Sequence, residues 1–159
     1  MNTSFVVVQI EGSADVSTCR NKYPNSMDKK IITVLIVTRS TPLAEGLHAL
    51  LTAIPQIETV RISRTFENAC QQVEANRIQI VLIDFILLGN HPTTALEKIQ
   101  KLSAATQRVL LVNDVHEVDL MPRYAEAILI KGAAPSAVTT IVTHLLIEKG
   151  EDHENNDPN

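Results

Sequence analysis

The stretch "IQIVLIDFILLG", residues 78–89, places a single carboxylate, Asp84, at the end of a continuous apolar run. A short run of β-branched and aliphatic residues is typical of a strand that is covered on both faces of a parallel sheet. An acid at the end of such a strand is a helix cap, a solvated loop residue or the working group of a site. The rest of the sequence has to distinguish these three roles.

The composition restricts the classes of protein that remain. The chain has 159 residues, of which 45% are hydrophobic and 20% charged, as expected for one globular domain. A formal charge of -4 and an aromatic content of 3% argue against nucleic-acid binding by this chain. No apolar run reaches the roughly 20 residues of a membrane helix, and the N-terminus lacks the features of a secretion signal. Cys19 and Cys70 have no metal-binding spacing, so we expect two reduced thiols in a cytoplasmic protein.

Three segments differ in character along the chain. Residues 1–28 are mostly polar and lack periodicity, so we expect a poorly ordered extension, and Met27 is a candidate for the true start. Residues 149–159 are polar and acidic and are predicted to form a disordered tail. The regular pattern lies between them, and we predict one domain over residues 30–148.

Within this domain, strand-like and helix-like patterns alternate. Strands are predicted at 32–38, 59–63, 78–84, 108–113 and 127–131. Helices are predicted to follow, the first capped by Thr41, the second opened by Thr65, the third over 91–102 and the last starting at Pro135. The connection after the fourth strand is the weakest element, a short irregular helix interrupted near Pro122. Strict alternation predicts an α/β fold, a doubly wound parallel sheet of five strands with helices on both faces.

The polar residues at the ends of the strands are candidates for a site. In open sheets of this kind, ligands bind just beyond the carboxyl ends of the strands. Those ends carry Thr38 and Arg39, Asp84, Asn113 and Asp114, and Lys131. Asp84 therefore occupies a position where a functional role is expected rather than a purely structural one.

At these residues the chain resembles the receiver domain of a bacterial response regulator, over about residues 30–147. The resemblance is carried by "ITVLIVTRSTPLAEGLHALL" (32–51), by "IQIVLIDFILLG", and by "AILIKGAAPSAVTTIV" (127–142). The first of these motifs is similar to receivers of LuxR/NarL-type transcription regulators. The resemblance implies the flavodoxin-like (CheY-like) strand order 2-1-3-4-5. It also implies that Asp84 is the phospho-acceptor and that Lys131 contacts the phosphoryl oxygens.

Other positions depart from the receiver pattern. Receivers usually carry two acids after the first strand, which help to hold Mg²⁺, whereas this chain has Thr38 and Arg39; they usually carry Ser or Thr where this chain has Asn113. We expect Asp84 to form ion pairs with both Arg39 and Lys131, since a charge pair at about 4 Å and an effective dielectric of about 20 is worth about 4 kcal/mol before desolvation. An Arg39 side chain that points to water is the alternative. The ion-paired cluster predicts a degenerate receiver with impaired Mg²⁺-dependent phosphorylation.

The opposite hypothesis keeps the site active. Arg39 would then stand in partly for the metal, Asp114 would supply a second acid, and Asp84 would accept a phosphoryl group with Mg²⁺ as cofactor. Otherwise we expect no cofactor and no metal.

We expect a binding module rather than an enzyme, because the chain has no Gly-rich phosphate loop and no nucleophile elbow. It would act in a two-component phosphorelay as a receiver without an attached output domain. The expected partners are signalling proteins, either a histidine kinase or an output protein, and we expect the face formed by residues 115–148 to bind them or a second copy. A small ligand bound in the crevice is a further alternative.

Overall fold

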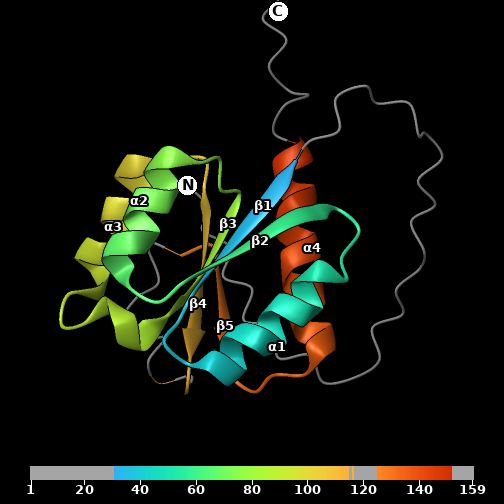
Figure 1. Cartoon of the computed structure of the whole chain (residues 1–159), viewed down its shortest axis with the longest axis horizontal. Coiled ribbons are helices and arrows are strands. Elements are labelled where there is room, and N and C mark those ends of the chain that lie inside the picture. Colours follow the sequence, from blue (N-terminus) through green and yellow to red (C-terminus); the bar gives the residue numbers. More distant parts are fainter. Residues whose placement is uncertain (1–30, 115, 117–124, 152–159) are drawn as a thin grey trace, which may run out of the picture.

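A five-stranded parallel sheet forms the centre of the protein. The computed structural model describes residues 31–114, 116 and 125–151. The strands are β1 (Ile32–Val37), β2 (Ile57–Ser63), β3 (Ile80–Asp84), β4 (Gln107–Val112) and β5 (Ala127–Ile130). They pair in the order β2-β1-β3-β4-β5, and all the pairings are parallel (Figure 1). The predicted flavodoxin-like, doubly wound sheet is therefore confirmed.

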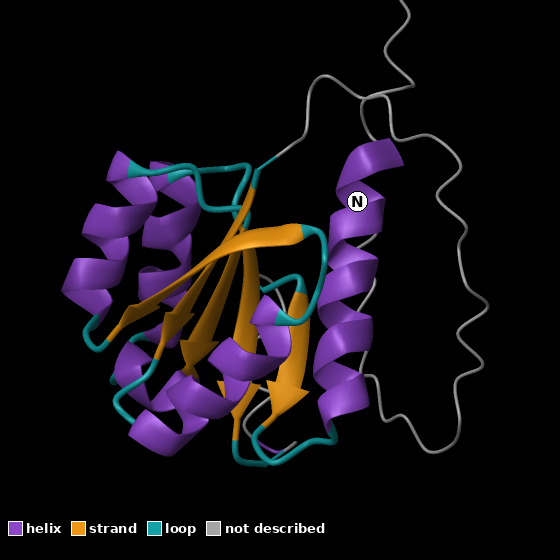
Figure 2. Cartoon of the chain, turned by 45° about the vertical axis from the view of Figure 1, so that its right-hand side comes forward, coloured by secondary structure: helices purple, strands orange, loops and turns teal. Residues whose placement is uncertain are grey.

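Helices cover both faces of this sheet. Their bounds are α1 (Thr41–Thr52), α2 (Phe66–Ala75), α3 (Pro92–Leu102) and α4 (Pro135–Glu151), and a short 3-10 helix, η1 (Phe85–Leu88), follows β3. α2 and α3 lie together on one face, whereas α1 and α4 lie on the other (Figures 1 and 2). Two apolar cores result, one on each side of the sheet.

The alternation of side chains along each strand divides the strands between these two cores. In β1, Val34 and Ile36 pack toward α1 and α4, whereas Leu35 and Val37 pack toward α2 and α3. The other central strands follow the same rule, because successive side chains point to opposite faces of a sheet. This explains why β1 and β3 are buried at every position while the edge strand β2 carries exposed residues.

α2 and α4 start as predicted, α3 begins at Pro92 rather than at residue 91, and α1 has a different cap. The hydroxyl of Ser40, not that of Thr41, caps α1 by accepting a hydrogen bond from the Leu43 N–H at 3.3 Å. Thr41 lies within the helix, and Pro42 follows it in the first turn, where the missing N–H costs nothing. Thr65 caps α2 as predicted, with its hydroxyl 3.1 Å from the Asn68 nitrogen. α4 starts at Pro135, also as predicted.

Several predicted boundaries differ by one or two residues. β2 begins at Ile57 rather than at residue 59, and β3 begins at Ile80 rather than at residue 78. β4 spans 107–112 and β5 ends at Ile130, each one residue before the predicted end. α4 runs to Glu151, into the segment that was predicted to be a tail.

Some expectations fall outside the described residues. These are the N-terminal extension at 1–28 with the start at Met27, most of the irregular element between β4 and β5, and the end of the tail from residue 152. Within the described ranges, no helix has both the length and the apolar character to cross a bilayer.

Candidate functional site at the carboxyl edge of the sheet

Asp84 is the last residue of β3 and is almost fully buried, with 3% of its surface exposed. Its backbone remains extended, and its Oδ1 accepts a hydrogen bond from the Ile86 N–H at 3.3 Å, which caps η1. One of the three roles expected for a strand-end acid, the helix cap, is therefore present, and burial excludes the solvated one. A cap alone would not require burial, however, and a buried carboxylate needs further partners.

Lys131 provides the charge that balances Asp84. Its ammonium nitrogen forms an ion pair with Oδ1 of Asp84, and the lysine side chain is 20% exposed. Lys131 directly follows β5, and its N–H donates to the Val112 carbonyl at 2.8 Å, which continues the ladder between β4 and β5. Gly132 then turns the chain with a φ of 84°, a conformation that residues with a Cβ rarely adopt. The structure brings together Asp84 and Lys131 as the sequence predicted.

Thr38 holds the other oxygen of the carboxylate. Its hydroxyl donates to Oδ2 of Asp84 at 2.9 Å and accepts from the Ser40 N–H at 3.1 Å. Only 1% of Thr38 is exposed, and its N–H donates to the Ser63 carbonyl at 3.0 Å. The hydroxyl therefore links the acid of β3 to the start of α1.

The predicted ion pair between Arg39 and Asp84 is wrong for this structure. The ion pairs of the described residues include Lys131 with Asp84 but not Arg39 with Asp84, and Arg39 is exposed. The Arg39 carbonyl accepts a hydrogen bond from the Arg64 guanidinium at 3.4 Å, which holds the loop backbone. The solvated alternative for Arg39 agrees with this geometry.

Strand alternation explains this outcome. Val37 lies opposite Ile83 in the register of β1 and β3, so Thr38 follows beside Asp84. Residues 34, 36 and 38 share one parity, which puts Thr38 on the side of Asp84, whereas Arg39 has the other parity and is exposed. The register of β1 against β3 decides this choice, and the structure supplies that register.

Asn113 and Asp114 follow β4 at the same edge. Both are exposed, and Oδ1 of Asp114 accepts from the His116 N–H at 3.2 Å, which closes the turn after the strand. The Asp114 carboxylate therefore contacts the backbone of its own loop.

The side chains around Asp84 do not provide the ligands of the Mg²⁺ site that the fold implies. Mg²⁺ is normally held by one or two carboxylates together with substrate oxygens and water. Both oxygens of Asp84 already accept hydrogen bonds or an ion pair, from Lys131, Thr38 and Ile86. In the part of the chain that the structure describes, no group of three or more His, Cys, Asp or Glu side chains is arranged to hold a metal. A lysine in contact with the single buried acid adds a positive charge where a cation would have to bind.

Several solved structures with a similar fold are receiver domains. No family model matches the sequence. No curated protein matches it either. A CheY-like response regulator receiver domain from Methanospirillum hungatei JF-1 superimposes with a TM-score of 0.67 at 20% identity, covering 77% of this chain and 98% of that one. The signal receiver domain of an HD domain-containing protein from Pseudomonas fluorescens Pf-5 gives a TM-score of 0.69 at 18% identity, covering 84% and 99%. A signal receiver domain from Vibrio parahaemolyticus gives 0.68 at 21% identity, covering 80% and 99%. At these identities the likeness establishes the receiver fold.

Proposed function

We propose that this chain is an atypical receiver domain of two-component signal transduction, which works by binding other signalling proteins and has lost efficient Mg²⁺-dependent phosphorylation. The observation that carries the proposal is the closed set of contacts around Asp84. A carboxylate that is already paired with an ammonium group and a hydroxyl has little tendency to attract a divalent cation. The proposal includes the cytoplasm as its location, where the free thiol of Cys70 would stay reduced.

The loss of a second acid supports this proposal in electrostatic terms. Phosphoryl transfer depends on neutralising charge on the phosphoryl oxygens and on positioning the nucleophile. Thr38 contributes no charge beside Asp84, and Arg39 is exposed and, among the described residues, forms no ion pair with Asp84. Lys131 would remain as the cation near the phosphoryl group, and one ammonium ion is a weaker substitute for a metal bound by several oxygens.

The alternative, a working phospho-acceptor at Asp84, is favoured by one specific observation. Asp84 and Lys131, the two positions that the receiver resemblance assigns to acceptor and phosphoryl contact, lie in direct contact at the carboxyl edge. In this reading, Lys131 would move from the carboxylate to the phosphoryl oxygens, and Thr38 would donate to one of them.

A phosphodonor experiment separates the two functions. The chain is incubated with Mg²⁺ and acetyl phosphate, and its intact mass is measured with Asp84→Asn as control. We expect no phosphoryl adduct on the folded wild-type protein. An adduct that requires Mg²⁺ and disappears in Asp84→Asn would establish the working acceptor instead.

The variant Thr38→Asp tests why the site is impaired. This change places a second carboxylate beside Oδ2 of Asp84, where the Thr38 hydroxyl now lies at 2.9 Å. Repulsion between the two acids should destabilise the variant, and Mg²⁺ should restore its stability by binding the native state. We expect Mg²⁺ to raise the melting temperature of Thr38→Asp and to leave that of the wild type unchanged.

The partner surface of the proposal is the face that includes β5 and α4. Residues 115–125 of the predicted 115–148 face lie outside the described residues, apart from His116 and Ala125. On the described part, Ile147 is a large aliphatic residue with 55% of its surface exposed. Binding of a histidine kinase or an output protein there remains a prediction, to be tested by pull-down with Ile147→Lys.

A further inference from the structure

Thr41, the first residue of α1, carries an exposed hydroxyl that does not cap the helix. Ser40 is the cap, and its side chain and carbonyl accept from the Leu43 and Ala44 N–H groups at 3.3 and 3.0 Å. The Thr41 hydroxyl is held from outside the helix instead. Both terminal nitrogens of the Arg64 guanidinium donate to its oxygen, each at 3.2 Å. Its own proton remains available, because a hydroxyl that accepts two hydrogen bonds still has one to donate.

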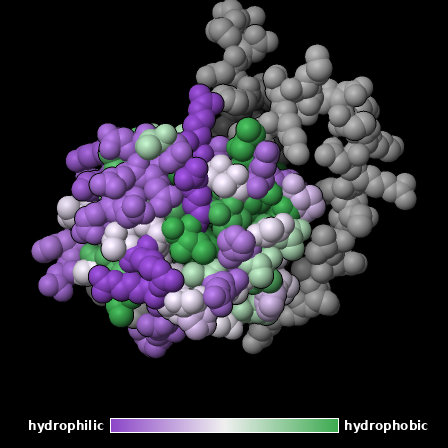
Figure 3. Space-filling view, in the orientation of Figure 1, coloured by the Kyte–Doolittle hydropathy of each residue, from purple (hydrophilic) through white to green (hydrophobic). Residues whose placement is uncertain are grey.

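Two guanidinium groups place positive charge around this hydroxyl. Arg39 and Arg64 are both exposed, and neither is paired with a carboxylate among the ion pairs of the described residues. Arg64 also donates to the Arg39 carbonyl at 3.4 Å, so the two residues lie in neighbouring loops. The first turn of α1 has no acidic residue to offset this charge, whereas the first turn of α2 has Glu67. Figure 3 shows hydrophilic residues on the lower left of the molecule, where β2 leads into α2 and α1 begins.

A phosphoryl group on Thr41 is the anion that fits these donors. It adds nearly two negative charges and three acceptor oxygens, and opposite arginines it forms charge-assisted hydrogen bonds. The planar fork of an arginine matches phosphate oxygens in pairs, and Arg64 already directs two nitrogens at the atom that would carry the group. Glu45, four residues along α1, would oppose the phosphate, but its side chain is exposed to water. Two arginines against one solvated glutamate leave the balance in favour of the anion.

We propose that Thr41 is a phosphorylation site for a serine/threonine protein kinase, and that Arg39 and Arg64 hold the phosphate once it is attached. In the transfer, the Thr41 hydroxyl oxygen attacks the γ-phosphorus of ATP on the kinase, and the hydroxyl proton passes to a base of the kinase. The new O–P bond replaces the bond from this phosphorus to the oxygen that bridges the last two phosphates. ADP leaves with the electron pair of the broken bond.

The start of α1 meets the requirement of access to a kinase. Thr41 and Pro42 are both exposed, and Ser40 has extended backbone angles, with a φ of -75° and a ψ of 111°. Pro42 has no N–H, so the first turn is fixed mainly by the two hydrogen bonds to Ser40. Helix ends of this kind open locally at low cost. The threonine is thus presented without disturbing the sheet.

A phosphate on Thr41 would act on the neighbouring site at the carboxyl edge. The Ser40 N–H donates to the Thr38 hydroxyl, which in turn donates to Asp84. Arginines drawn to the phosphate would fix the loop between Thr38 and Thr41, and their positive charge would be neutralised on the surface that a partner meets. This switch needs no metal at Asp84. It goes beyond the proposed function and holds whether or not Asp84 accepts a phosphoryl group.

The first test uses the full 159-residue chain with phosphothreonine encoded at position 41. The second pKa of the phosphate, followed by phosphorus NMR, should fall below about 5.5, because the arginines favour the dianion. The melting temperature should rise by about 3 °C. Phosphothreonine at position 139 is the matched control, since Thr139 is also exposed on a helix and its hydroxyl donates to the Pro135 carbonyl. The control phosphate should titrate near about 6.

Substitutions of Arg64 show whether the arginine is responsible. In the chain phosphorylated at position 41, Arg64→Gln should return the pKa of the phosphate toward about 6. Arg64→Lys keeps the charge without the fork and should preserve part of the decrease. A phosphate at position 41 that titrates like the one at position 139 would overturn the proposal, because the arginines then do not hold it.

The second test locates the modification in cells that make the chain. Trypsin cleaves after Arg39 and Arg61, so the recovered protein yields the peptide 40–61 for fragmentation by mass spectrometry. We expect a phosphoryl group on the Thr41 oxygen in this peptide. A peptide that is unmodified in every growth phase, or modified only on Ser40 or another residue, would overturn the proposal.

Discussion

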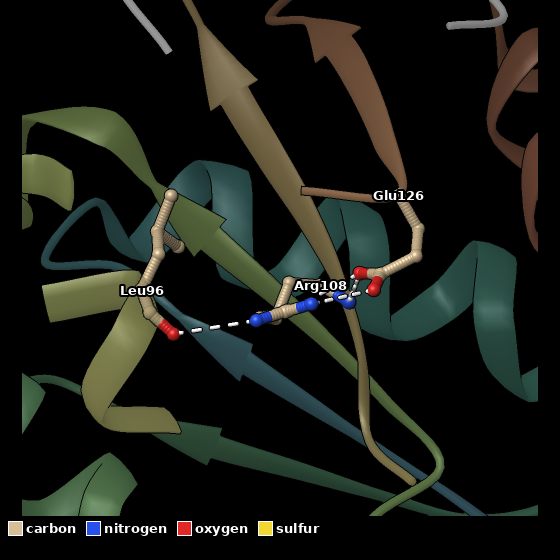
Figure 4. A network of polar contacts seen from close by, with 3 residues as sticks. All are labelled: Leu96, Arg108 and Glu126. Carbon is tan, nitrogen blue, oxygen red and sulfur yellow. Dashed lines mark hydrogen bonds and ion pairs between the residues drawn. The ribbon is translucent and has the colours of Figure 1, made fainter. Parts of the chain in front are cut away.

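The two ends of the sheet each hold a buried ion pair, and the two pairs are built differently. At the amino end, Arg108 of β4 is 5% exposed and binds Glu126, the residue before β5 (Figure 4). Two guanidinium nitrogens of Arg108 donate to the two oxygens of Glu126, at 2.6 and 3.2 Å, and a third donates to the Leu96 carbonyl of α3 at 3.4 Å. The Arg108 N–H also donates to Glu126 at 2.6 Å. Side chains and backbone thus tie together α3, β4 and β5.

The pair at the carboxyl end is simpler. Lys131 meets Asp84 through a single ammonium group on a flexible stem, and its side chain is 20% exposed. An ammonium group is a compact charge without a fixed fork of donors, so it can exchange one partner for another or for water. The other contacts of Asp84 are hydrogen bonds from the Thr38 hydroxyl and the Ile86 N–H.

This difference indicates which end can change state. A bidentate guanidinium that also donates to the Leu96 carbonyl of α3 anchors the fold, because moving any one group would leave others unsatisfied. The carboxyl end carries fewer and more replaceable contacts around a buried acid. Under the proposed function, binding of a partner protein rearranges these contacts without loosening the sheet.

The largest effect is expected at the amino end. Glu126→Gln removes the charge that balances a buried guanidinium and should lower the free energy of unfolding by about 3 kcal/mol. This is the low end of the loss expected when one partner of a buried ion pair is removed, because the Glu126 side chain is one-third exposed. Urea denaturation measures this. A second variant, Arg108→Met with Glu126→Gln, should recover part of the loss, since no unpaired buried charge remains. If Glu126→Gln lowers the free energy of unfolding by less than about 1 kcal/mol, the Arg108–Glu126 pair contributes no more than a surface ion pair and does not anchor the fold.

An intermediate effect is expected at the carboxyl end, and it should be asymmetric. Lys131→Met leaves the almost fully buried carboxylate of Asp84 without a countercharge and should cost about 2 kcal/mol. Asp84→Asn leaves a lysine that can turn toward water and should cost about 1 kcal/mol or less. Equal costs for the two variants would contradict the view that Lys131 is the exchangeable partner.

A smaller effect is expected from the hydroxyl at this end. Thr38→Val keeps the shape of the side chain and removes its hydrogen bonds to Asp84 and from Ser40, so it should cost about 1 kcal/mol. Arg39→Ala, one residue further, should change stability by less than about 0.5 kcal/mol because its side chain is exposed. A larger loss of stability for Arg39→Ala than for Thr38→Val would show that the Arg39 side chain contributes to the site.

The smallest effect concerns a group at neither end. Cys70 of α2 is 6% exposed, and burial raises the pKa of its thiol, with Lys98 acting weakly in the opposite direction. The unfolded chain therefore loses this proton first, and stability should fall slightly as pH rises above about 8.5, the usual pKa of a thiol. Comparing Cys70→Ala with the parent at pH 7 and pH 9.5 would measure this loss, which should vanish in the variant.

The sequence predicted the sheet and the pairing of Asp84 with Lys131, because both follow from local rules. Apolar runs identify covered strands, and the carboxyl ends of parallel strands meet at one edge. The choice between Thr38 and Arg39 needed the register of β1 against β3, and a shift of one residue reverses which side chain faces the acid. The pair of Arg108 and Glu126 was missed for a related reason. It joins residues 18 apart across a connection without a clear pattern, and only the alignment of β4 with β5 brings them together.

A Mg²⁺ titration followed by amide resonances, with and without beryllofluoride, tests most directly whether the acid at the end of β3 is closed to metal. We predict no saturable shift of the resonances of Thr38, Asp84 and Lys131 at millimolar Mg²⁺, because Lys131 and the Thr38 hydroxyl already occupy the carboxylate. Saturating shifts centred on these residues, and abolished by Asp84→Asn, would contradict the account and identify a receiver that can still be switched.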